Sequence, residues 1–418
     1  MIYRLPIFCC FLMLHNWAFS QESLPLKPVI CHFSEENSFT EILSDDFFKN
    51  NIRLAATSDI EVNYINFPTQ AKIAFEQAVA IWEKYLVSSQ IIRITATWST
   101  TLSNTTLAET GASRIYKNIA GLPYTNIWYP TPLAEALTGR DLNAGEADIN
   151  ISINGNINWY YGIDGKAQAG KYDMITVLLH EIAHGLGFSS SMSVVNSSTQ
   201  GQYGQSGSAY IFDTFMQDSQ KIKLTNASFY GNPSTGLKVP LISNALYFGL
   251  SNARFANALP QLYAPSPYKE GSSFSHFDES AYPAGTTNSL MSPSVRAAEV
   301  NQNPGELLLN CLSEMGWYIS GLIGNVVTSN ESIPEQNFEV KVFPNPVEDY
   351  LNVAFPLQSQ IRDIKIELIN PQGQILQSIE NQSVMVGNYA IDVRFLPEGM
   401  YFLKVVDGVK IKTFKVVK

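Results

Sequence analysis

Segment 171–188 constrains the fold most, because it is apolar on nearly every side and yet carries two histidines and a glutamate. Asp173 is well placed to cap the start of a helix, and a helix that is apolar all around must be buried. His180, Glu181 and His184 lie within it in the pattern H-E-x-x-H. Residues four apart share one helical face, so both imidazoles can reach the same ion.

The polar groups of this buried helix favour a metal, and Zn²⁺ in particular. Two imidazoles and a carboxylate would stay unsatisfied in an apolar core unless something binds them. Catalytic zinc takes three protein ligands and keeps one position for water. Glu181 lies next to the ligand face and can reach that water without binding the ion. The competing interpretation is two hydrogen-bonded core histidines with Glu181 at a solvated edge.

A third ligand must come from elsewhere in the chain. The extended motif H-E-x-x-H-x-x-G-x-x-H is followed through Gly187, but Ser190 stands at its last position. Of the other histidines, His15 lies in the N-terminal leader and His32 far upstream, which leaves His276 as the only downstream imidazole. We therefore predict His276 as the third ligand. Three carboxylates compete with it: Asp213, Glu279 and Glu299.

Helix and strand patterns outside this segment indicate a mixed α/β layer. Residues 68–87 have apolar side chains at three- and four-residue spacing, which predicts an amphipathic helix, and residues 90–98 are rich in β-branched residues, typical of a strand. Residues 147–154 alternate, which predicts a half-exposed strand. Its edge is a candidate for holding an extended substrate, and an ordinary core strand is the alternative. Residues 189–271 are interpreted as an insertion with short elements, and residues 304–316 predict a further helix.

The N-terminus predicts export. Residues 1–20 have one early arginine, an apolar run and small residues near their end, which is typical of a secretory signal peptide. No later stretch reaches the roughly 18 uninterrupted apolar residues that a spanning helix needs, so no transmembrane anchor is expected. Residues 21–60 fit no fold pattern and are interpreted as an N-terminal segment and candidate pro-region.

Two cysteines remain once the signal peptide is removed, Cys31 and Cys311. A disulfide between them is one alternative in an oxidising compartment. A Cys31 thiolate that caps the metal in a latent form is the second. Two buried free thiols are the third, and sequence spacing alone does not choose among them.

A charge boundary and a linker set off the C-terminal part. The chain has 27 Lys and Arg against 37 Asp and Glu, a net charge of -10, which argues against nucleic acid as a partner. Residues 338–418 hold nine residues of each sign, so the acidic excess lies before them. Residues 321–337 predict a linker. From residue 338 onward, short strands alternate with PNP, NPQG and PEG turns, which is typical of a β-sandwich.

The order of helix, strand, edge strand, HEIAHGLGF, histidine and methionine turn resembles the metzincin metalloproteases over about residues 60–318. The displaced third histidine is similar to the leishmanolysin branch, in which an insertion precedes that ligand. The resemblance implies an α+β catalytic domain over residues 61–320, a mixed twisted sheet with a buried active-site helix. It makes Glu181 the general base and Met291 a support beneath the metal. It places Zn²⁺ on three ligands: His180, His184 and His276.

Residues 338–418, with VFPNPVEDYLNV and LPEGMYFLKV, resemble the C-terminal sorting domain of the type IX secretion system of Bacteroidetes. This resemblance implies a small all-β immunoglobulin-like sandwich, contact with the secretion machinery, and passage across the outer membrane, usually with removal of the domain. An adhesive or carbohydrate-binding sandwich is the alternative. The protein is expected outside the cell or at its surface.

These expectations combine in a secreted zinc endopeptidase that hydrolyses peptide bonds of extracellular proteins. Glu181 takes a proton from the activated water and later hands it to the leaving amine. Two rivals remain open. One is an extracellular or cell-surface binding protein with a structural four-ligand metal site, for which Asp278 would be a fourth donor. The other is a zinc hydrolase that acts on non-peptide substrates.

Overall fold

The computed structural model describes residues 22–43, 58–195, 199–250 and 259–319 of the N-terminal part. In the C-terminal part it describes residues 341–343, 345–347, 350–354, 364–370, 374–381, 388–394, 396–407 and 410–418. The predicted signal peptide, residues 1–20, and the predicted linker, residues 321–337, lie outside the described residues.

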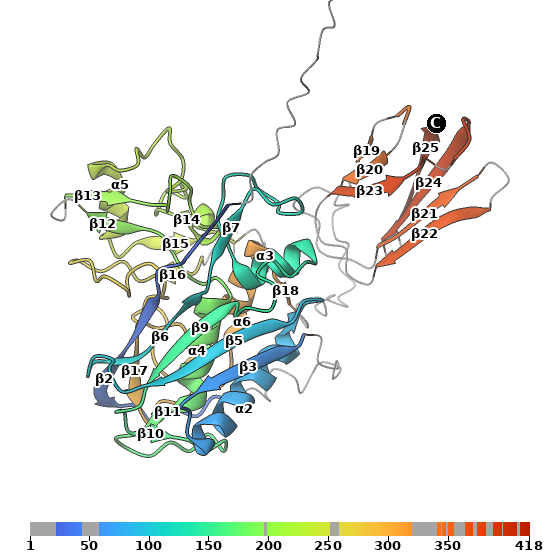
Figure 1. The fold of residues 1–418 in the computed structure, drawn as a ribbon. Helices are drawn as coiled ribbons and strands as arrows, with labels where there is room; N and C mark the ends of the chain where they lie inside the picture. The colour runs from blue at the N-terminus through green and yellow to red at the C-terminus, as the bar shows by residue number, and fades with distance from the viewer. Residues whose placement is uncertain are drawn as a thin grey trace, which may run out of the picture.

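A six-stranded mixed sheet forms the frame of the larger part (Figure 1). The strands β3 (Ile60–Ile65), β5 (Ile92–Ser99) and β9 (Ile149–Asn154) run parallel, and β6 (Thr106–Ala112) runs antiparallel to β9. Beyond β6 lie β2 (Val29–Asn37), which is antiparallel to it, and β17 (Ser294–Ala297), which is parallel to β2. The sheet order is therefore β17-β2-β6-β9-β5-β3.

The prediction that residues 147–154 offer an exposed edge is wrong. Strand β9 lies between β5 and β6 and is hydrogen-bonded on both sides. The alternation of residue type reflects the two faces of an internal strand: Ile149, Ile151 and Ile153 are buried, whereas Asn150 is exposed. Strand order is set by long-range pairing, which the local pattern does not encode.

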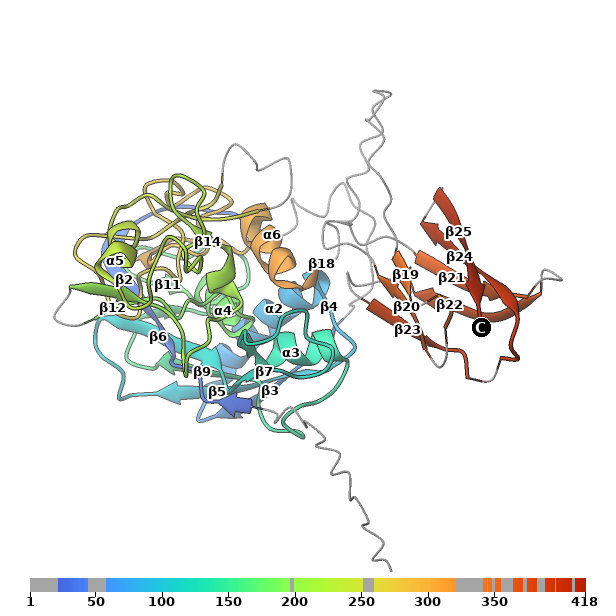
Figure 2. The ribbon, with the colours of Figure 1, turned by 90° about the horizontal axis from the view of Figure 1, so that it is seen from above.

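Helices cover one face of the sheet (Figure 2). In α2 (Thr69–Tyr85) the predicted apolar face is buried, and in α4 (Met174–Gly185) every residue is buried. The two helices are in contact, and Trp82 Nε1 of α2 donates a hydrogen bond to the Leu179 carbonyl of α4 at 3.2 Å. The helix α6 (Gly305–Met315) ends at Gly316, whose φ of 118° is left-handed, and α3 (Thr131–Thr138) ends at Gly139, whose φ of 65° is also left-handed.

Asp173 starts α4 as predicted. Its carboxylate accepts hydrogen bonds from the Thr176 backbone N–H at 2.8 Å and from Thr176 Oγ1 at 2.7 Å. Apolar side chains surround the helix because it packs between the sheet, α2 and the later loops. The sequence therefore places a helix with polar ligating groups in the centre of the core.

Short elements fill the predicted insertion and the connections. Within residues 189–271, the described elements are β12 (Ser193–Val195), β13 (Gln200–Gln202), a 3-10 helix (Phe212–Phe215), β14 (Met216–Gln217), α5 (Thr235–Leu241), β15 (Leu246–Phe248) and β16 (Gln261–Leu262). Their buried aromatic residues Phe212 and Phe248 belong to the same core as the sheet. The connecting strands are β4 (Leu86–Val87), β7 (Ile115–Lys117), β8 (Tyr129–Pro130), β10 (Trp159–Tyr160), β11 (Tyr172–Asp173) and β18 (Tyr318–Ile319).

The N-terminal segment is part of this frame. Strand β1 (Glu22–Leu24) pairs with β7, and β2 lies inside the sheet between β6 and β17. No fold could be predicted for residues 21–60, because both strands pair with partners that lie far away in the chain. Residues 22–43 therefore pack in the same sheet as the strands that follow residue 60, and the two segments form one packed unit.

The C-terminal part is an antiparallel sandwich with its own core. One sheet contains β19 (Lys341–Phe343), β20 (Tyr350–Ala354) and β23 (Asn388–Asp392). The other contains β22 (Ile375–Asn381), β21 (Ile364–Ile369), β24 (Met400–Asp407) and β25 (Lys410–Val417). Their inner faces meet in a separate cluster of buried residues that includes Leu351, Val353, Ile366, Leu403 and Val405. The α+β class and the all-β C-terminal part are as predicted.

Gly187, two residues after the end of α4, has a left-handed φ of 114°, which favours glycine. A Cβ at this position would lie 2.8 Å from Pro130 Cγ, whereas a Cβ at Gly170, which also has a left-handed φ, would meet nothing within 4 Å. We expect Gly170→Ala to lower the free energy of unfolding by about 1 kcal/mol through backbone strain. Gly187→Ala should cost about 2–4 kcal/mol, because overpacking adds to strain. Urea unfolding of both variants checks this; equal losses would contradict the packing argument.

Candidate metal centre

Three imidazoles from two distant segments meet in the core. His180 and His184 lie one turn apart on α4, and His276 lies in the chain between β16 and β17. The Nε2 atoms of His180 and His184 are 2.9 Å apart. His276 Nε2 lies 3.2 Å from that of His180 and 3.3 Å from that of His184. All three side chains are buried.

Backbone carbonyls fix the orientation of each ring. Nδ1 lies 2.7 Å from the Leu290 carbonyl in His180, 2.6 Å from the Phe188 carbonyl in His184, and 2.6 Å from the Ser272 carbonyl in His276. A carbonyl oxygen only accepts, so each Nδ1 carries the proton and each Nε2 presents a lone pair. This is the arrangement of hydrogen bonds that orients metal-binding histidines.

The three rings are neutral near pH 7. Burial lowers the pKa of His180 to about 4, and burial also holds the pKa of His184 and of His276 well below the ordinary histidine value. Three lone pairs therefore converge without a proton between them.

These donors fit a tetrahedral zinc ion. Zinc–nitrogen bonds of about 2.0–2.1 Å at tetrahedral angles hold their nitrogens about 3.3–3.4 Å apart. Two of the three Nε2 separations, 3.2 Å and 3.3 Å, lie close to that range, and the third, 2.9 Å, is shorter. Within the described residues, His180, His184 and His276 form a group of convergent ligand atoms that could hold a metal ion.

Glu181 lies beside this triad, next to the Cys31 thiol. Its side chain is fully buried, and the thiol is a hydrogen-bonding neighbour of its carboxylate. Burial raises the pKa of Glu181 to about 8. A buried carboxylate is costly without a compensating contact, and the Cys31 thiol is one such contact.

Hydrogen bonds join the loop of His276 to the methionine turn and join that turn to α4. The His276 carbonyl accepts from the Tyr263 N–H and the Phe277 N–H donates to the Met291 carbonyl, both at 2.8 Å. Met291 is buried and directly follows Leu290, whose carbonyl holds His180. The turn therefore supports the site through its backbone, and a role for the Met291 side chain stays a prediction.

Ser190, which replaces the third histidine of the extended motif, has a structural role. Its N–H donates to Ser275 Oγ at 3.0 Å, next to His276, and its hydroxyl donates to Asp213 Oδ1 at 2.7 Å. The displaced ligand is thus tied to the turn after α4. The insertion belongs to the same hydrogen-bond network through Asp213, whose carboxylate also accepts a hydrogen bond from the Tyr210 N–H at 2.9 Å.

The competing carboxylates have other partners. Asp213 is held as described above, Glu299 accepts from the Arg296 N–H at 2.9 Å, and Glu279 pairs with the Arg296 guanidinium. Asp278, the proposed fourth donor of a structural site, accepts from the Ser280 N–H at 2.9 Å. In the part of the chain that the structure describes, none of the four belongs to the groups that could hold a metal ion.

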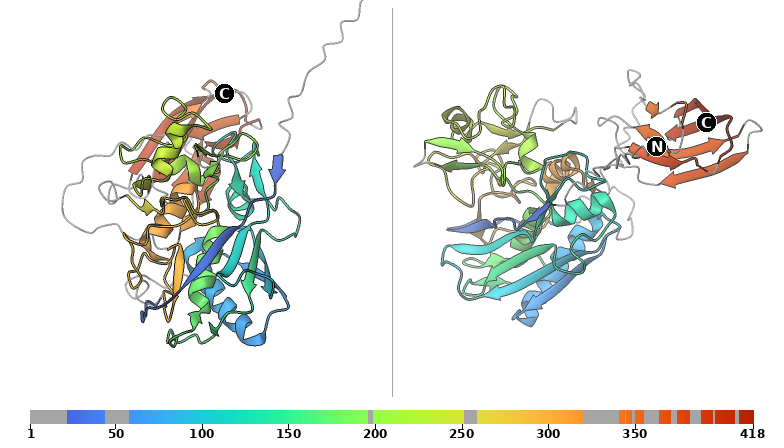
Figure 3. Two further views of the ribbon diagram at one scale, coloured as in Figure 1. Left: turned by 90° about the vertical axis from the view of Figure 1, so that its left-hand side faces the viewer. Right: turned by 45° about the horizontal axis from the view of Figure 1, so that its top comes forward.

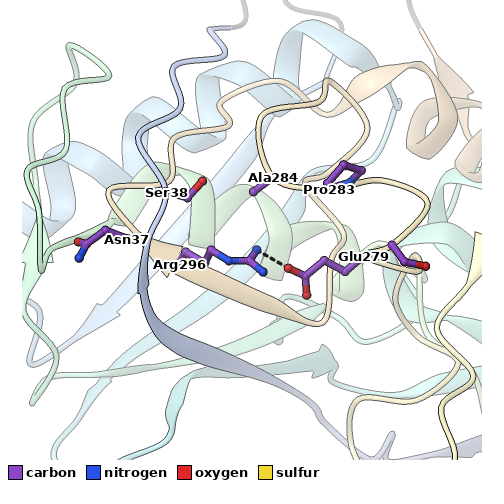
Figure 4. Close-up of a pocket in the computed structure, with 7 residues that line it drawn as sticks. Asn37, Ser38, Glu279, Pro283, Ala284 and Arg296 are labelled. Atoms are coloured by element: carbon purple, nitrogen blue, oxygen red, sulfur yellow. Dashed lines mark ion pairs between the residues drawn. The ribbon is translucent and has the colours of Figure 1, made fainter.

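Glu279 and Arg296 instead line a surface pocket of about 530 Å³, together with Asn37, Ser38 and Pro283 (Figure 4). The Glu279 carboxylate and the Arg296 guanidinium form an ion pair across this pocket, so each neutralises the charge of the other. None of the three histidines lines it.

Cys31 is the residue whose position the sequence left open. It is fully buried and free, as is Cys311, so the two do not form a disulfide in this structure. Its sulfur forms a second close group with His180 and Glu181, whose ligand atoms all lie within 4.8 Å of one another. Burial raises the pKa of the Cys31 thiol well above its ordinary value. Only the pairing of β2 with β6, a contact between distant segments, brings this sulfur to the site.

Comparisons with known proteins identify the C-terminal part. The family model described as a secretion system C-terminal sorting domain matches residues 341–418. A model described as SPBPB7E8-like matches residues 97–217, a range that contains α4. Neither description names a metalloprotease, so the metzincin resemblance stays a prediction. No curated protein matches the chain.

Among solved structures, the chain is similar to PorZ of Porphyromonas gingivalis, described as an essential bacterial surface component of the type IX secretion system. The identity is 20%, and the match covers 19% of this chain and 11% of PorZ with a TM-score of 0.16. This likeness is too slight to argue from.

Removing one ligand tests the triad. We expect the zinc-loaded full chain to hold one ion, and His276→Ala to lose most of it, because two imidazoles bind zinc far more weakly than three. The matched control is His32→Ala, since His32 lies outside the triad with its Nδ1 at 3.2 Å from the Thr105 carbonyl. Zinc per chain is measured by atomic emission. Unchanged zinc in His276→Ala would contradict His276 as the third ligand.

Within the described residues, no helix is both long and apolar enough to cross a membrane. Residues 341–418 match the sorting domain that directs type IX secretion, and this tail implies contact with that machinery. The chain is accordingly a secreted or cell-surface protein.

Proposed function

We propose that this protein is a secreted zinc-dependent endopeptidase. One observation carries the proposal: three neutral imidazoles converge through Nε2 beside a fully buried carboxylate. Three nitrogen donors with a base next to the open position are the donor set of hydrolytic rather than structural zinc sites.

Each side chain has a separate task in this proposal. Bound zinc would supply Lewis acidity, which lowers the pKa of water to about 7 and polarises a substrate carbonyl. Glu181 accepts the proton of a water molecule that lies between it and the triad. A cation beside Glu181 favours its charged form, which opposes the effect of burial and readies it as a base. Glu181 then returns the proton to the leaving amine.

The apolar core around α4 assists this chemistry. It keeps bulk water from the carboxylate, so the proton that Glu181 accepts is retained for the leaving group. The carbonyls that hold the three Nδ1 atoms keep the rings in place throughout.

The rival with a structural metal needs a fourth protein ligand in place of water. Asp278 is bonded to Ser280 instead, which weakens that form of the rival. A zinc hydrolase that acts on non-peptide substrates is the second rival, and an assay on protein substrate separates it from an endopeptidase.

Glu181→Gln tests the proposal, because the amide keeps the shape of the side chain and cannot accept a proton. The zinc-loaded full chain is assayed on casein in two states. One is the protein as purified, and the other is the protein after brief treatment with trypsin, which an inhibitor stops before casein is added. We expect the variant to lose at least about 10²-fold in rate while keeping its zinc. Glu299→Gln is the control, since Glu299 is also buried but lies outside the triad. A wild type that holds zinc and releases no peptides in either state would refute the proposal.

We expect the sorting tail, residues 341–418, to be required for secretion but not for the metal site. A chain that ends at residue 340 should accumulate inside a host with type IX secretion, whereas the full chain reaches the surface or the medium. Cell fractionation with immunoblotting measures this. Full-length Glu181→Gln is the control and should be delivered like the wild type, because delivery depends on the tail. Normal export of the truncated chain would contradict the assignment.

A further inference from the structure

The stretch of chain that carries His276 continues the small sheet of the insertion. That sheet has the order β14-β15-β16, and residues 274–278 lie beyond β16. The Phe274 N–H donates to the Tyr263 carbonyl and the Tyr263 N–H donates to the His276 carbonyl, both at 2.8 Å. Figure 3 shows the insertion, in yellow-green, apart from the strands of the main sheet, with the golden chain that follows it leading back towards them. The third imidazole is therefore held by the insertion.

Phe274, two residues before this imidazole, has a backbone conformation that its residue type disfavours. Its φ of 76° lies in the left-handed region, where a Cβ is crowded by the following carbonyl oxygen. Gly187, which turns the chain after α4, is also left-handed, but it is a glycine. A bulky residue keeps a left-handed backbone only when its surroundings hold it there. The packing around Phe274 must therefore fix the backbone against its own preference.

The ring of Phe274 supplies that packing. It is fully buried in the core that also contains α4 and the main sheet. It stacks on the ring of Tyr268, with ring centroids 5.4 Å apart and an interplanar angle of 19°. Tyr268 packs against the same core. A rotation of φ into the favoured region would swing the Cβ of Phe274 and take its ring out of these contacts, so the buried ring holds the backbone left-handed.

This backbone conformation decides where His276 points. Before Phe274, residues 269–273 form a tight turn that is closed on the Lys269 carbonyl. After it, Nδ1 of His276 lies 2.6 Å from the Ser272 carbonyl, the contact that directs Nε2 towards the other two imidazoles. Residue 274 lies between the two partners of this hydrogen bond. A change in its φ therefore moves the imidazole away from the Ser272 carbonyl and from the other two ligands.

We propose that Phe274 is a positioning residue of the metal centre, whose buried ring holds a left-handed backbone that aims His276 at the other two ligands. The inference rests on the metal site of the proposed function and not on the peptidase reaction. It gives the insertion a task, because Tyr263 and Tyr268, which hold Phe274, both belong to it. It also implies that a chain with all three histidines can lose affinity for zinc.

Two substitutions at residue 274 separate the ring from the backbone. Phe274→Ala removes the ring and keeps a Cβ, so the metal-free backbone relaxes and zinc must restore it. Phe274→Gly removes the same ring, but glycine accepts a φ of 76° without strain. The zinc dissociation constant of each full chain is measured by competition with a chromophoric chelator. We expect Phe274→Ala to bind zinc at least about tenfold more weakly than the wild type, and Phe274→Gly no more than about threefold more weakly.

Phe248→Ala is the matched control, because Phe248 is equally buried in the sheet of the insertion but has the backbone of a strand residue. It should unfold at a lower urea concentration and keep the zinc affinity of the wild type. Equal zinc affinities in Phe274→Ala and Phe274→Gly would overturn the proposal, since both variants lack the ring and differ in the backbone that they prefer. A comparable loss of zinc affinity in Phe248→Ala would also overturn it, because any loss of core packing would then weaken the site.

A milder variant decides the question if Phe274→Ala does not fold. Tyr268 is only partly buried, so Tyr268→Ala removes the stacking partner and leaves the Phe274 ring in the core. It should weaken zinc binding at least about threefold in the wild-type chain. In Phe274→Gly it should have no further effect, because no ring remains to be held. An unchanged zinc affinity in Tyr268→Ala, or the same loss in both backgrounds, contradicts the proposed role of Phe274.

This proposal and the proposed function fail in different ways, because zinc affinity is measured without substrate. Glu181-dependent cleavage of casein together with equal zinc affinities in Phe274→Ala and Phe274→Gly refutes the positioning role and leaves the peptidase intact. The expected zinc affinities in a chain that cleaves no casein refute the peptidase and leave the positioning role intact. A wild type that binds no zinc refutes both.

Discussion

The convergence of three imidazole nitrogens in an apolar core is the interaction on which the account depends. Each Nδ1 is bonded to a backbone carbonyl, so the three Nε2 lone pairs face one another at 2.9–3.3 Å. Such an arrangement is repulsive unless a cation lies among the nitrogens, because burial prevents the rings from taking up protons. The buried carboxylate of Glu181 lies beside them, and a cation among the nitrogens would also stabilise its charged form.

The fold holds this unfavourable arrangement in place with contacts that do not involve a metal. Helix α4 is buried on all sides and carries two of the rings, so neither can turn out to solvent. Ser190 joins the end of that helix to the loop of His276 and, through Asp213, to the insertion. The site is therefore preorganised by packing and by backbone hydrogen bonds, as a centre that must bind a metal in a fixed geometry requires.

Local pattern in the sequence was sufficient for some features and not for others. His180, Glu181 and His184 follow from helical periodicity, and His276 followed from elimination among five histidines rather than from spacing. The substrate edge was misplaced, because the order β2-β6-β9-β5 depends on pairing between distant segments. The same pairing decides where Cys31 lies, so the sequence could only name it as one of three alternatives. The C-terminal sandwich was predictable because its strands and turns alternate locally.

X-ray absorption at the zinc edge of the metal-loaded full chain tests the central claim most directly. The account predicts three imidazole nitrogens at about 2.0–2.1 Å, with the multiple-scattering features of histidine. A first shell made mainly of carboxylate oxygens, or one with fewer than three imidazoles, would contradict it.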